Sequence, residues 1–324
     1  MSSSRSASEV RPDEERVPSA ERAQPVVGAP ASAAVFLVLT VEPGGEPVAR
    51  DLLAGLAGLV RSVGFGHPEG QLSCVAGIGA DGWDRICGPV GRPAALHSFP
   101  PLEGPRHRAV ATPGDLLFHL RATRPDLCFA LATEIVKRLR GVAVLQDEVH
   151  GFSYFDARNL LGFVDGTENP VGRVAAETAL VGAEDPAFAG GSYAIVQKYL
   201  HDVEAWEKLA TEEQEGVIGR TKATNIELER PGSHADVNTL TGDDGEERRI
   251  LRAAMPFGRP GHGEFGTYFI AYARDPEVPE TMLRRMFLGT EDTGPDPILD
   301  FSEAVTGTLF FVPSTDHLKR LAAR

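Results

Sequence analysis

Three short segments of the chain carry residue types that could do chemistry. The first covers residues 162–170, where two glycines flank Asp165 and a polar run ends at a proline. Glycine permits unusual dihedral angles and close approach of the backbone, so this loop can press against a flat ligand. Two other interpretations stay open. The segment can be an ordinary turn, or Asp165 and Glu168 can be oxygen ligands of a hard cation.

The second and third segments each place one polar side chain in an unusual setting. His234 stands alone within residues 231–236. A lone histidine is more often a surface residue or a hydrogen-bonded core residue than a ligand, and all three roles stay open here. Arg252 lies between apolar residues in the segment 250–258. Such a guanidinium must find an anionic partner or extend its head to water.

Hydrophobic periodicity predicts the elements that must position these segments. In the first half, short apolar runs predict strands at 33–41, 72–78, 115–122 and 142–152. Apolar residues at helical spacing predict helices at 48–63 and 125–140. For the second helix, Thr123 is the expected cap and Pro125 suits the first turn.

The second half repeats this element order. Strands are predicted at 192–200, 268–273 and 308–312, with a helix from the capping residue Asp202 to about Glu215 and another at 279–287. Residues 216–266 lack clear periodicity, and irregular stretches of this length are usually functional. We therefore expect an α+β fold of two ferredoxin-like domains with antiparallel sheets, at 31–155 and 156–316, the second carrying the chemistry.

Composition narrows the class of protein. The net charge of −14 disfavours non-specific binding of nucleic acid. Cys74, Cys87 and Cys128 are odd in number and form no C-x-x-C pair, so we expect buried thiols rather than a disulfide framework or a structural zinc site. Residues 1–30 lack the apolar core of a signal peptide and are expected to be a disordered tail, with a second short tail at 317–324. No stretch is apolar enough to span a membrane, which predicts a cytoplasmic protein.

Together the three segments resemble the dye-decolourising peroxidases, and the longer form of the first segment resembles their B-type group. Residues 162–170 match the G-x-x-D-G signature of that family. Further matching segments follow in the same order at 191–199, 266–270, 285–289 and 299–302. The resemblance covers nearly the whole chain from about 31 to about 312. It implies two ferredoxin-like domains, with haem b in the C-terminal one, and oxidation of dyes and phenolics by hydrogen peroxide in one-electron steps.

The resemblance also implies roles for individual residues. His234 takes the position of the axial ligand of the haem iron, and Asp300 that of the carboxylate on the other ring nitrogen. Asp165 and Arg252 take the positions of the catalytic pair, and Arg220 that of a partner of a haem propionate. The other residues expected against the cofactor are Gly166, Thr167, Glu168, Asn169 and Phe269. Because C-x-x-C-H is absent, the haem is expected to be non-covalent.

One departure from the family pattern concerns the residues after Arg252. B-type relatives usually carry an aspartate and an asparagine there, whereas this chain has Ala253 and Ala254. Because alanine donates no side-chain hydrogen bond, we expect slower activation of peroxide. An alternative is a haem-binding or haem-delivery protein with weak peroxidase activity. Retention of Asp165 and Arg252 argues against it, since storage needs no acid and guanidinium beside the cofactor.

The expected partners are hydrogen peroxide and small organic reductants. Relatives often form closed oligomers, so a homo-oligomer is expected. Some relatives dock inside protein shells through a flexible C-terminal tail. The chain reaches Arg324 soon after its last predicted strand, without a long Gly-rich apolar tail. Encapsulation in a shell is therefore not expected.

Overall fold

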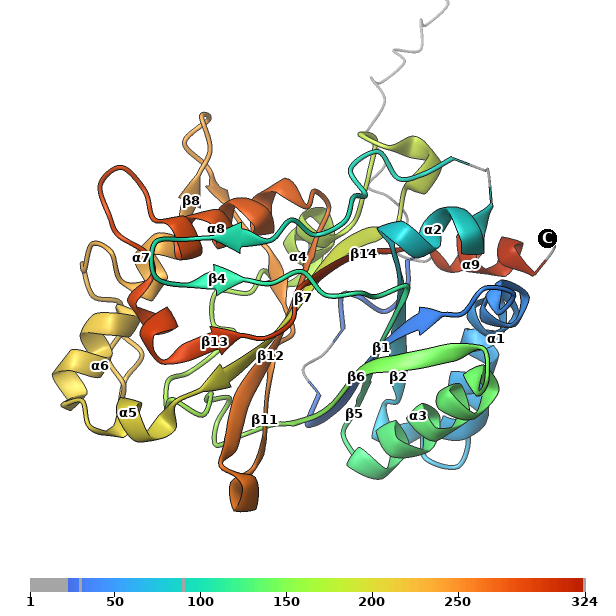
Figure 1. The fold of residues 1–324 in the computed structure, drawn as a ribbon, viewed down its shortest axis with the longest axis horizontal. Coiled ribbons are helices and arrows are strands. Elements are labelled where there is room, and N and C mark those ends of the chain that lie inside the picture. Colours follow the sequence, from blue (N-terminus) through green and yellow to red (C-terminus); the bar gives the residue numbers. More distant parts are fainter. Residues whose placement is uncertain (1–22, 29–30, 89–90, 323–324) are drawn as a thin grey trace, which may run out of the picture.

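The computed structural model describes residues 23–28, 31–88 and 91–322. The chain forms two halves, each built on an antiparallel sheet with helices on its outer side (Figure 1). This confirms the predicted α+β class.

The N-terminal half has the strand order β2-β5-β1-β6, with every pair antiparallel. This is the ferredoxin-like arrangement, in which two helices cover one face of the sheet. Its main elements are β1 (Ala33–Val41), α1 (Glu46–Gly64), β2 (Ser73–Gly79), β5 (Leu116–Ala122), α3 (Pro125–Leu139) and β6 (Ala143–Phe152). The short elements are η2 (Pro68–Gly70), α2 (Ala80–Cys87), β3 (Leu102–Glu103) and β4 (Arg108–Ala109).

The β3–β4 hairpin reaches from the N-terminal half across to α8 (Glu277–Leu288) of the C-terminal half (Figure 1). It packs closely there, because a Cβ on Gly104 would lie 2.0 Å from the carbonyl oxygen of Phe287. The hairpin therefore covers part of the half that was expected to carry the chemistry.

The C-terminal half has the strand order β10-β12-β7-β14. Its strands are β7 (Ser192–His201), β10 (Leu251–Arg252), β11 (Met255–Arg259), β12 (Glu264–Ala273), β13 (Ser302–Ala304) and β14 (Thr308–Val312), with β8 (Leu240–Thr241) and β9 (Glu247–Arg248) paired separately. Besides α8, its helices are α4 (Gly172–Ala179), α5 (Val203–Glu207), α6 (Thr211–Ile218), α7 (His234–Asn238), α9 (Thr315–Leu321), η3 (Pro186–Phe188), η4 (Pro260–His262) and η5 (Pro297–Asp300).

The two sheets join at their edges, where β14 pairs with β2. Gln24 secures this junction. Its side-chain amide donates to the carbonyl oxygens of Ala76 and Pro313 at 2.8 Å, and its oxygen accepts from the Ala76 amide at 2.8 Å. The N-terminal segment thus ties β2 to the residue that follows β14.

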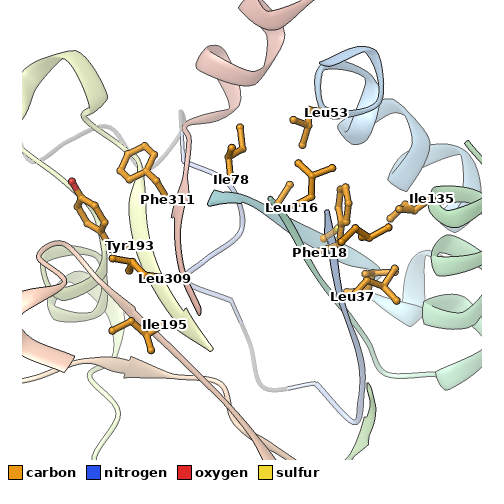
Figure 2. Packing of buried hydrophobic residues seen from close by; sticks show 14 of the residues in the cluster. Leu37, Leu53, Ile78, Leu116, Phe118, Ile135, Tyr193, Ile195, Leu309 and Phe311 are labelled. Carbon is orange, nitrogen blue, oxygen red and sulfur yellow. The ribbon is translucent and has the colours of Figure 1, made fainter. Parts of the chain in front are cut away.

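Alternation along the strands sorts buried side chains into two layers. On β1, Phe36 and Val38 point between the two sheets, whereas Leu37 and Leu39 point toward the helices. Each leucine that is fully buried in this way contributes about 1.5–3 kcal/mol relative to an exposed one. Figure 2 shows the outer layer, which runs through Leu53, Leu116, Phe118, Ile135, Tyr193, Ile195, Leu309 and Phe311.

The structure corrects several expectations at element ends. Asp202 caps a helix, accepting from the Ala205 amide at 2.9 Å, but α5 ends at Glu207 and a second helix, α6, follows. The break lets both helices bury apolar residues, including Trp206, in one cluster. Thr123 does not cap α3. Its hydroxyl instead donates to the carbonyl oxygen of Glu69.

Neither terminal boundary is where it was expected. Residues 23–28 of the expected disordered tail are packed, with Gln24 and Val26 buried, and the rest of that tail lies outside the described residues. At the other end, residues 315–321 form α9, whose Leu318 and Leu321 are buried. Within the described ranges, no helix is both long and apolar enough to cross a membrane.

Replacing Gln24 with alanine is expected to destabilise the fold. The change leaves the Ala76 amide and two carbonyl oxygens without their partner, which costs about 1–3 kcal/mol in the free energy of unfolding. Chemical denaturation measures this loss. Gln146→Ala is the matched control, because the Gln146 side chain is exposed and donates to the Thr40 hydroxyl at the surface, so a change within about 0.5 kcal/mol is expected. Equal losses in both variants would contradict the role of Gln24.

Candidate functional site

A cavity of about 320 Å³ lies on the face of the C-terminal sheet that points away from the N-terminal sheet. Alternation again decides which side chains face it. On β12, Thr267 and Phe269 line the cavity, whereas Tyr268 packs between the sheets. Arg252 and Ala254 line it from the adjacent strand segment, and Ala253 packs on the inter-sheet side. Much of the remaining wall is apolar, formed by Leu161, Phe163, Ile218, Ile250, Met282, Leu283 and Met286.

His234 lies in the cavity wall at the first position of α7. Ser233 caps this short helix, and the Asn238 side chain donates to the His234 carbonyl oxygen at 2.8 Å. The ring nitrogen Nδ1 lies 2.7 Å from Oδ2 of Asp296. Because a carboxylate only accepts, Nδ1 carries a proton, and in the neutral form of the ring Nε2 keeps its lone pair. The imidazole is therefore oriented as a ligand would be.

Asp296, and not Asp300, holds this imidazole. Asp296 is fully buried at the start of η5, where its other oxygen accepts from the Ile298 amide at 3.0 Å. Asp300 lies at the far end of that short helix, facing the β3–β4 hairpin. There it accepts from Arg106 at 2.7 and 2.9 Å and contacts His107 at 2.8 Å. The role expected for Asp300 was wrong, because one turn of helix separates the two carboxylates. The Asp296–Pro297 pair is an N-cap signal that could have identified Asp296.

The charge balance around His234 favours its protonated form. Burial alone would lower the pKa of the imidazole, but the charge and hydrogen bond of Asp296 outweigh burial, and the pKa is raised above its ordinary value. Arg252 lowers the pKa and Asp165 raises it. Both residues are thus close enough to His234 to act on its charge.

Asp165 and Arg252 reach the cavity from two segments that Asn169 connects. Gly166 turns the loop with a φ of +79°, and the Asp165 amide donates to the Ala157 carbonyl oxygen at 2.8 Å. The Asn169 side chain donates to the Arg252 carbonyl oxygen at 2.7 Å and accepts from the Arg252 amide at 2.9 Å. In the part of the chain that the structure describes, Asn169 is not among the lining residues. Its side chain holds the Arg252 backbone instead of facing the cavity.

Arg252 has a polar atom that the protein does not satisfy. Its Nε is buried and has no hydrogen-bond partner within residues 23–28, 31–88 and 91–322. A buried donor of this kind is costly unless a ligand or a water meets it. The side chain therefore suits an anionic or oxygen-bearing ligand in the cavity.

The other predicted contact residues also line the cavity. Gly166, Thr167 and Phe269 do so directly. Arg220 lines it as well, and its Nη2 donates to Glu168 at 2.8 Å and to Glu227 at 3.0 Å. An anionic group of a ligand would bind the Arg220 guanidinium beside Glu168 and Glu227 or in place of them.

Sequence reasoning missed His201, which also lines the cavity. Its two ring nitrogens lie 2.8 Å from the Ser302 hydroxyl and 2.9 Å from the Thr267 hydroxyl. Burial lowers the pKa of His201 to about 4, so the ring is neutral. The strand was expected to end at Leu200. Because side chains alternate along a strand, extending the predicted strand by one residue would have placed His201 on the same face as Tyr199.

The hard-cation interpretation has little support. Glu168 is paired with Arg220, which takes up the carboxylate that a cation would need. Throughout the described ranges, no group of three His, Cys, Asp or Glu side chains is arranged to hold a metal ion.

Comparisons with known proteins show which proteins this chain resembles. The family models for the Dyp-type peroxidase N-terminal and C-terminal domains match residues 23–153 and 156–317. A dye-decolorizing peroxidase of Mycolicibacterium paratuberculosis is 55% identical over 91% of this chain and 84% of its own. A variant of DypB from Rhodococcus jostii RHA1, solved in complex with haem, is 55% identical and superimposes with a TM-score of 0.89, covering 91% of this chain and 97% of that one.

A third comparison corrects the expectation about encapsulation. The cryo-EM structure of the encapsulated DyP-type peroxidase from Mycobacterium smegmatis is 52% identical, with a TM-score of 0.90 over 92% of this chain and 97% of that chain. Because so similar a relative is encapsulated, the exclusion drawn from the C-terminal residues was wrong.

Replacing Asp296 with asparagine is expected to lower the pKa of His234, because the opposing effect of burial then dominates. NMR titration of the haem-free protein measures this pKa. Asp300→Asn is the matched control and should leave it unchanged, since Asp300 bonds to Arg106 and His107 instead. If the pKa of His234 falls in Asp300→Asn and is unchanged in Asp296→Asn, Asp300 has the role first expected for it.

The same contact predicts a pH dependence of stability. The pKa of His234 is raised in the folded state, so protonation of this imidazole increases the free energy of unfolding. This stabilisation is fully present below the unfolded pKa of about 6.5. That contribution disappears as the pH rises through the folded-state pKa. The difference in unfolding free energy between the haem-free wild type and Asp296→Asn should therefore shrink as the pH rises from about 6.5 through the folded-state pKa of His234.

Proposed function

The chain belongs to the Dyp-type peroxidase family and is a peroxide-dependent oxidoreductase, and on this basis we propose that its cavity binds haem b through His234. The proposed reaction reduces hydrogen peroxide and oxidises small organic molecules, such as dyes and phenolics, in one-electron steps. One observation carries the proposal. An imidazole held by a buried carboxylate shares a cavity with an acid and a guanidinium.

The residues present fit a haem. The walls are largely apolar, the Nε2 lone pair of His234 is not used by Asp296, and the Arg252 Nε lacks a protein partner among the described residues. The haem complex of the 55% identical DypB variant supports the same cofactor. In this proposal His234 ligates the iron and Arg220 binds a propionate, while Gly166, Thr167, Glu168 and Phe269 contact the cofactor. When bound, the haem supplies the redox centre that takes electrons from organic substrates.

The chain's own residues prepare the proton and charge steps. Asp296 accepts the Nδ1 proton of His234 in a hydrogen bond, which makes the imidazole a stronger electron donor. The Asp165 carboxylate takes the first proton of hydrogen peroxide and returns it to the departing oxygen. Arg252 stabilises the negative charge that develops as the O–O bond breaks. Asn169 holds the Arg252 backbone so that the guanidinium stays in the cavity.

The alternative of haem delivery with little turnover is less well supported. A carrier needs a ligand and an apolar pocket, but it does not need an acid and a guanidinium fixed beside them. Peroxide-dependent bleaching of a dye by the purified protein distinguishes the two functions.

Replacing His234 with glutamine is expected to remove iron ligation. The haem absorption band should be lost or shifted, and the reaction with peroxide should slow by at least about a hundredfold. Visible spectra before and after peroxide measure both effects. His201→Gln is the control, because both ring nitrogens of His201 already bond to hydroxyl groups. If the haem band is lost in His201→Gln and kept in His234→Gln, the assignment of His234 as the iron ligand is wrong.

Replacing Ala254 with asparagine is expected to accelerate the reaction with peroxide. The new amide would enter the cavity beside Arg252 and add a hydrogen bond of about 1–3 kcal/mol in the transition state. Stopped-flow mixing with peroxide measures the rate. Ala253→Asn provides the matched control, since Ala253 packs between the sheets, where an amide can only destabilise. The proposal fails if Ala254→Asn gives no gain.

A further inference from the structure

A tyrosine and a histidine form an isolated polar pair in the apolar layer between the two sheets. The Tyr272 hydroxyl on β12 lies 2.8 Å from Nδ1 of His119 on β5. Both residues are fully buried, and they come from different halves of the chain. Neither residue belongs to the cavity lining or to the proposed peroxide chemistry.

The hydrogen bond has a preferred direction. If the Tyr272 hydroxyl donates to Nδ1, only the Nε2 proton of His119 stays unpaired, and Nε2 has no partner within the described residues. If Nδ1 donates instead, both the tyrosine hydroxyl proton and the Nε2 lone pair are unsatisfied. Burying fewer unsatisfied groups costs less, so the phenol donates. Burial, together with the charge of Arg121, holds the pKa of His119 well below its usual range, which leaves the ring neutral and able to accept.

The pair ends a continuous aromatic stack. The His119 ring stacks on Phe36 with centroids 4.6 Å apart, and Phe36 stacks on Tyr268 at 4.2 Å. The rings of His119 and Tyr272 are nearly parallel at 6.1 Å. This stack fills the layer directly behind β12, the strand whose other face lines the cavity.

The stack and the cavity therefore lie on opposite faces of the same sheet, separated by one layer of backbone. Tyr268 lies between Thr267 and Phe269 in the sequence, and both of these neighbours line the cavity. Arg252, which also lines the cavity, is the strand partner of Ala271, the residue before Tyr272. An electron from the pair has a short, covalently connected route through β12.

Two other buried tyrosines lack this combination. Tyr193 accepts from the Ala95 amide at 3.1 Å, and Tyr199 bonds to the Gln197 amide oxygen at 2.8 Å. Neither a backbone amide nor a side-chain amide oxygen is a base. Oxidation of a phenol inside a protein requires a group that takes its proton, because the oxidised phenol is a far stronger acid than an imidazolium.

We propose that Tyr272 and His119 form a redox-active pair that donates one electron to the haem site when organic reductant is absent. The O–H bond of Tyr272 breaks, its proton moves to Nδ1 of His119, and one electron leaves through β12. The products are a neutral tyrosyl radical and an imidazolium. The oxidant is the oxidising equivalent that peroxide reduction generates, so the inference rests on the proposed function. A later electron from a substrate reverses the step.

Burial of His119, together with the positive charge of Arg121, disfavours the imidazolium. The pair therefore gives up an electron only to a strong oxidant. A substrate that is easier to oxidise is consumed first, and the pair acts once substrate runs out. It would then hold an oxidising equivalent that would otherwise damage the cavity walls, where Met282 and Met286 are exposed to it.

Freeze-quench EPR of the haem-loaded enzyme, mixed with one equivalent of peroxide and no reductant, tests the proposal. The wild type should give a radical signal that narrows when its tyrosines carry deuterium. Tyr272→Phe should reduce the signal at least fivefold and lower severalfold the number of turnovers before inactivation. His119→Gln, which keeps a hydrogen-bond acceptor but removes the base, should reduce the signal similarly. Tyr193→Phe is the matched buried control and should retain it.

The outcomes separate this inference from the proposed function. If the haem band of the wild type responds to peroxide but the signal survives in Tyr272→Phe, or disappears equally in Tyr193→Phe, the redox pair is wrong and the peroxidase function stands. If the haem band does not respond at all, both fail. A readout independent of haem is the tautomer of His119, measured by nitrogen NMR in the full-length protein. A proton on Nε2 is expected, and a proton on Nδ1 would overturn the proposed proton transfer.

Discussion

The contact between His234 and Asp296 is the interaction on which the site depends. A carboxylate with no solvent exposure is stable only if its oxygens are bonded, and Asp296 meets this condition through the imidazole and the Ile298 amide. The Asp296 carboxylate fixes the orientation and the tautomer of the His234 ring. The two residues are far apart in sequence, so α7 and η5 must both be in place before the imidazole is oriented. The site is thus a product of the tertiary fold.

The N-terminal half contributes to this arrangement although none of its described residues lines the cavity. Its β3–β4 hairpin binds Asp300 at the end of η5 through Arg106 and His107, and it packs against the end of α8. The Asp296 amide donates to the Met286 carbonyl oxygen in that same helix. Elements from both halves therefore converge behind His234. The edge pairing of β14 with β2, secured by Gln24, holds the halves in register for this contact.

The sequence was informative wherever periodicity or a local motif determines structure. The main strands were predicted from short apolar runs and the main helices from apolar residues at helical spacing. His234, Asp165 and Arg252 all reach one cavity. The assignment of Asp300 failed because two aspartates stand four residues apart, and only the direction of a short helix decides which is buried. Asn169 was placed against the cofactor because it lies in the matched loop, yet its side chain turns to the Arg252 backbone. The packed segment at Gln24 carries no local signal, since its bonds reach residues 52 and 289 positions away.

Strand alternation also explains how one strand serves two environments. On β12 the residues Thr267 and Phe269 face the cavity, and Tyr268 and Tyr272 face the layer between the sheets. A shift of register by one residue would exchange the two sets, so the register that forms the cavity also forms the aromatic stack. The same rule separates Ala253 from Ala254, which are neighbours in sequence but lie on opposite faces. Residues that line the cavity and residues that pack between the sheets consequently share the backbone of a single strand.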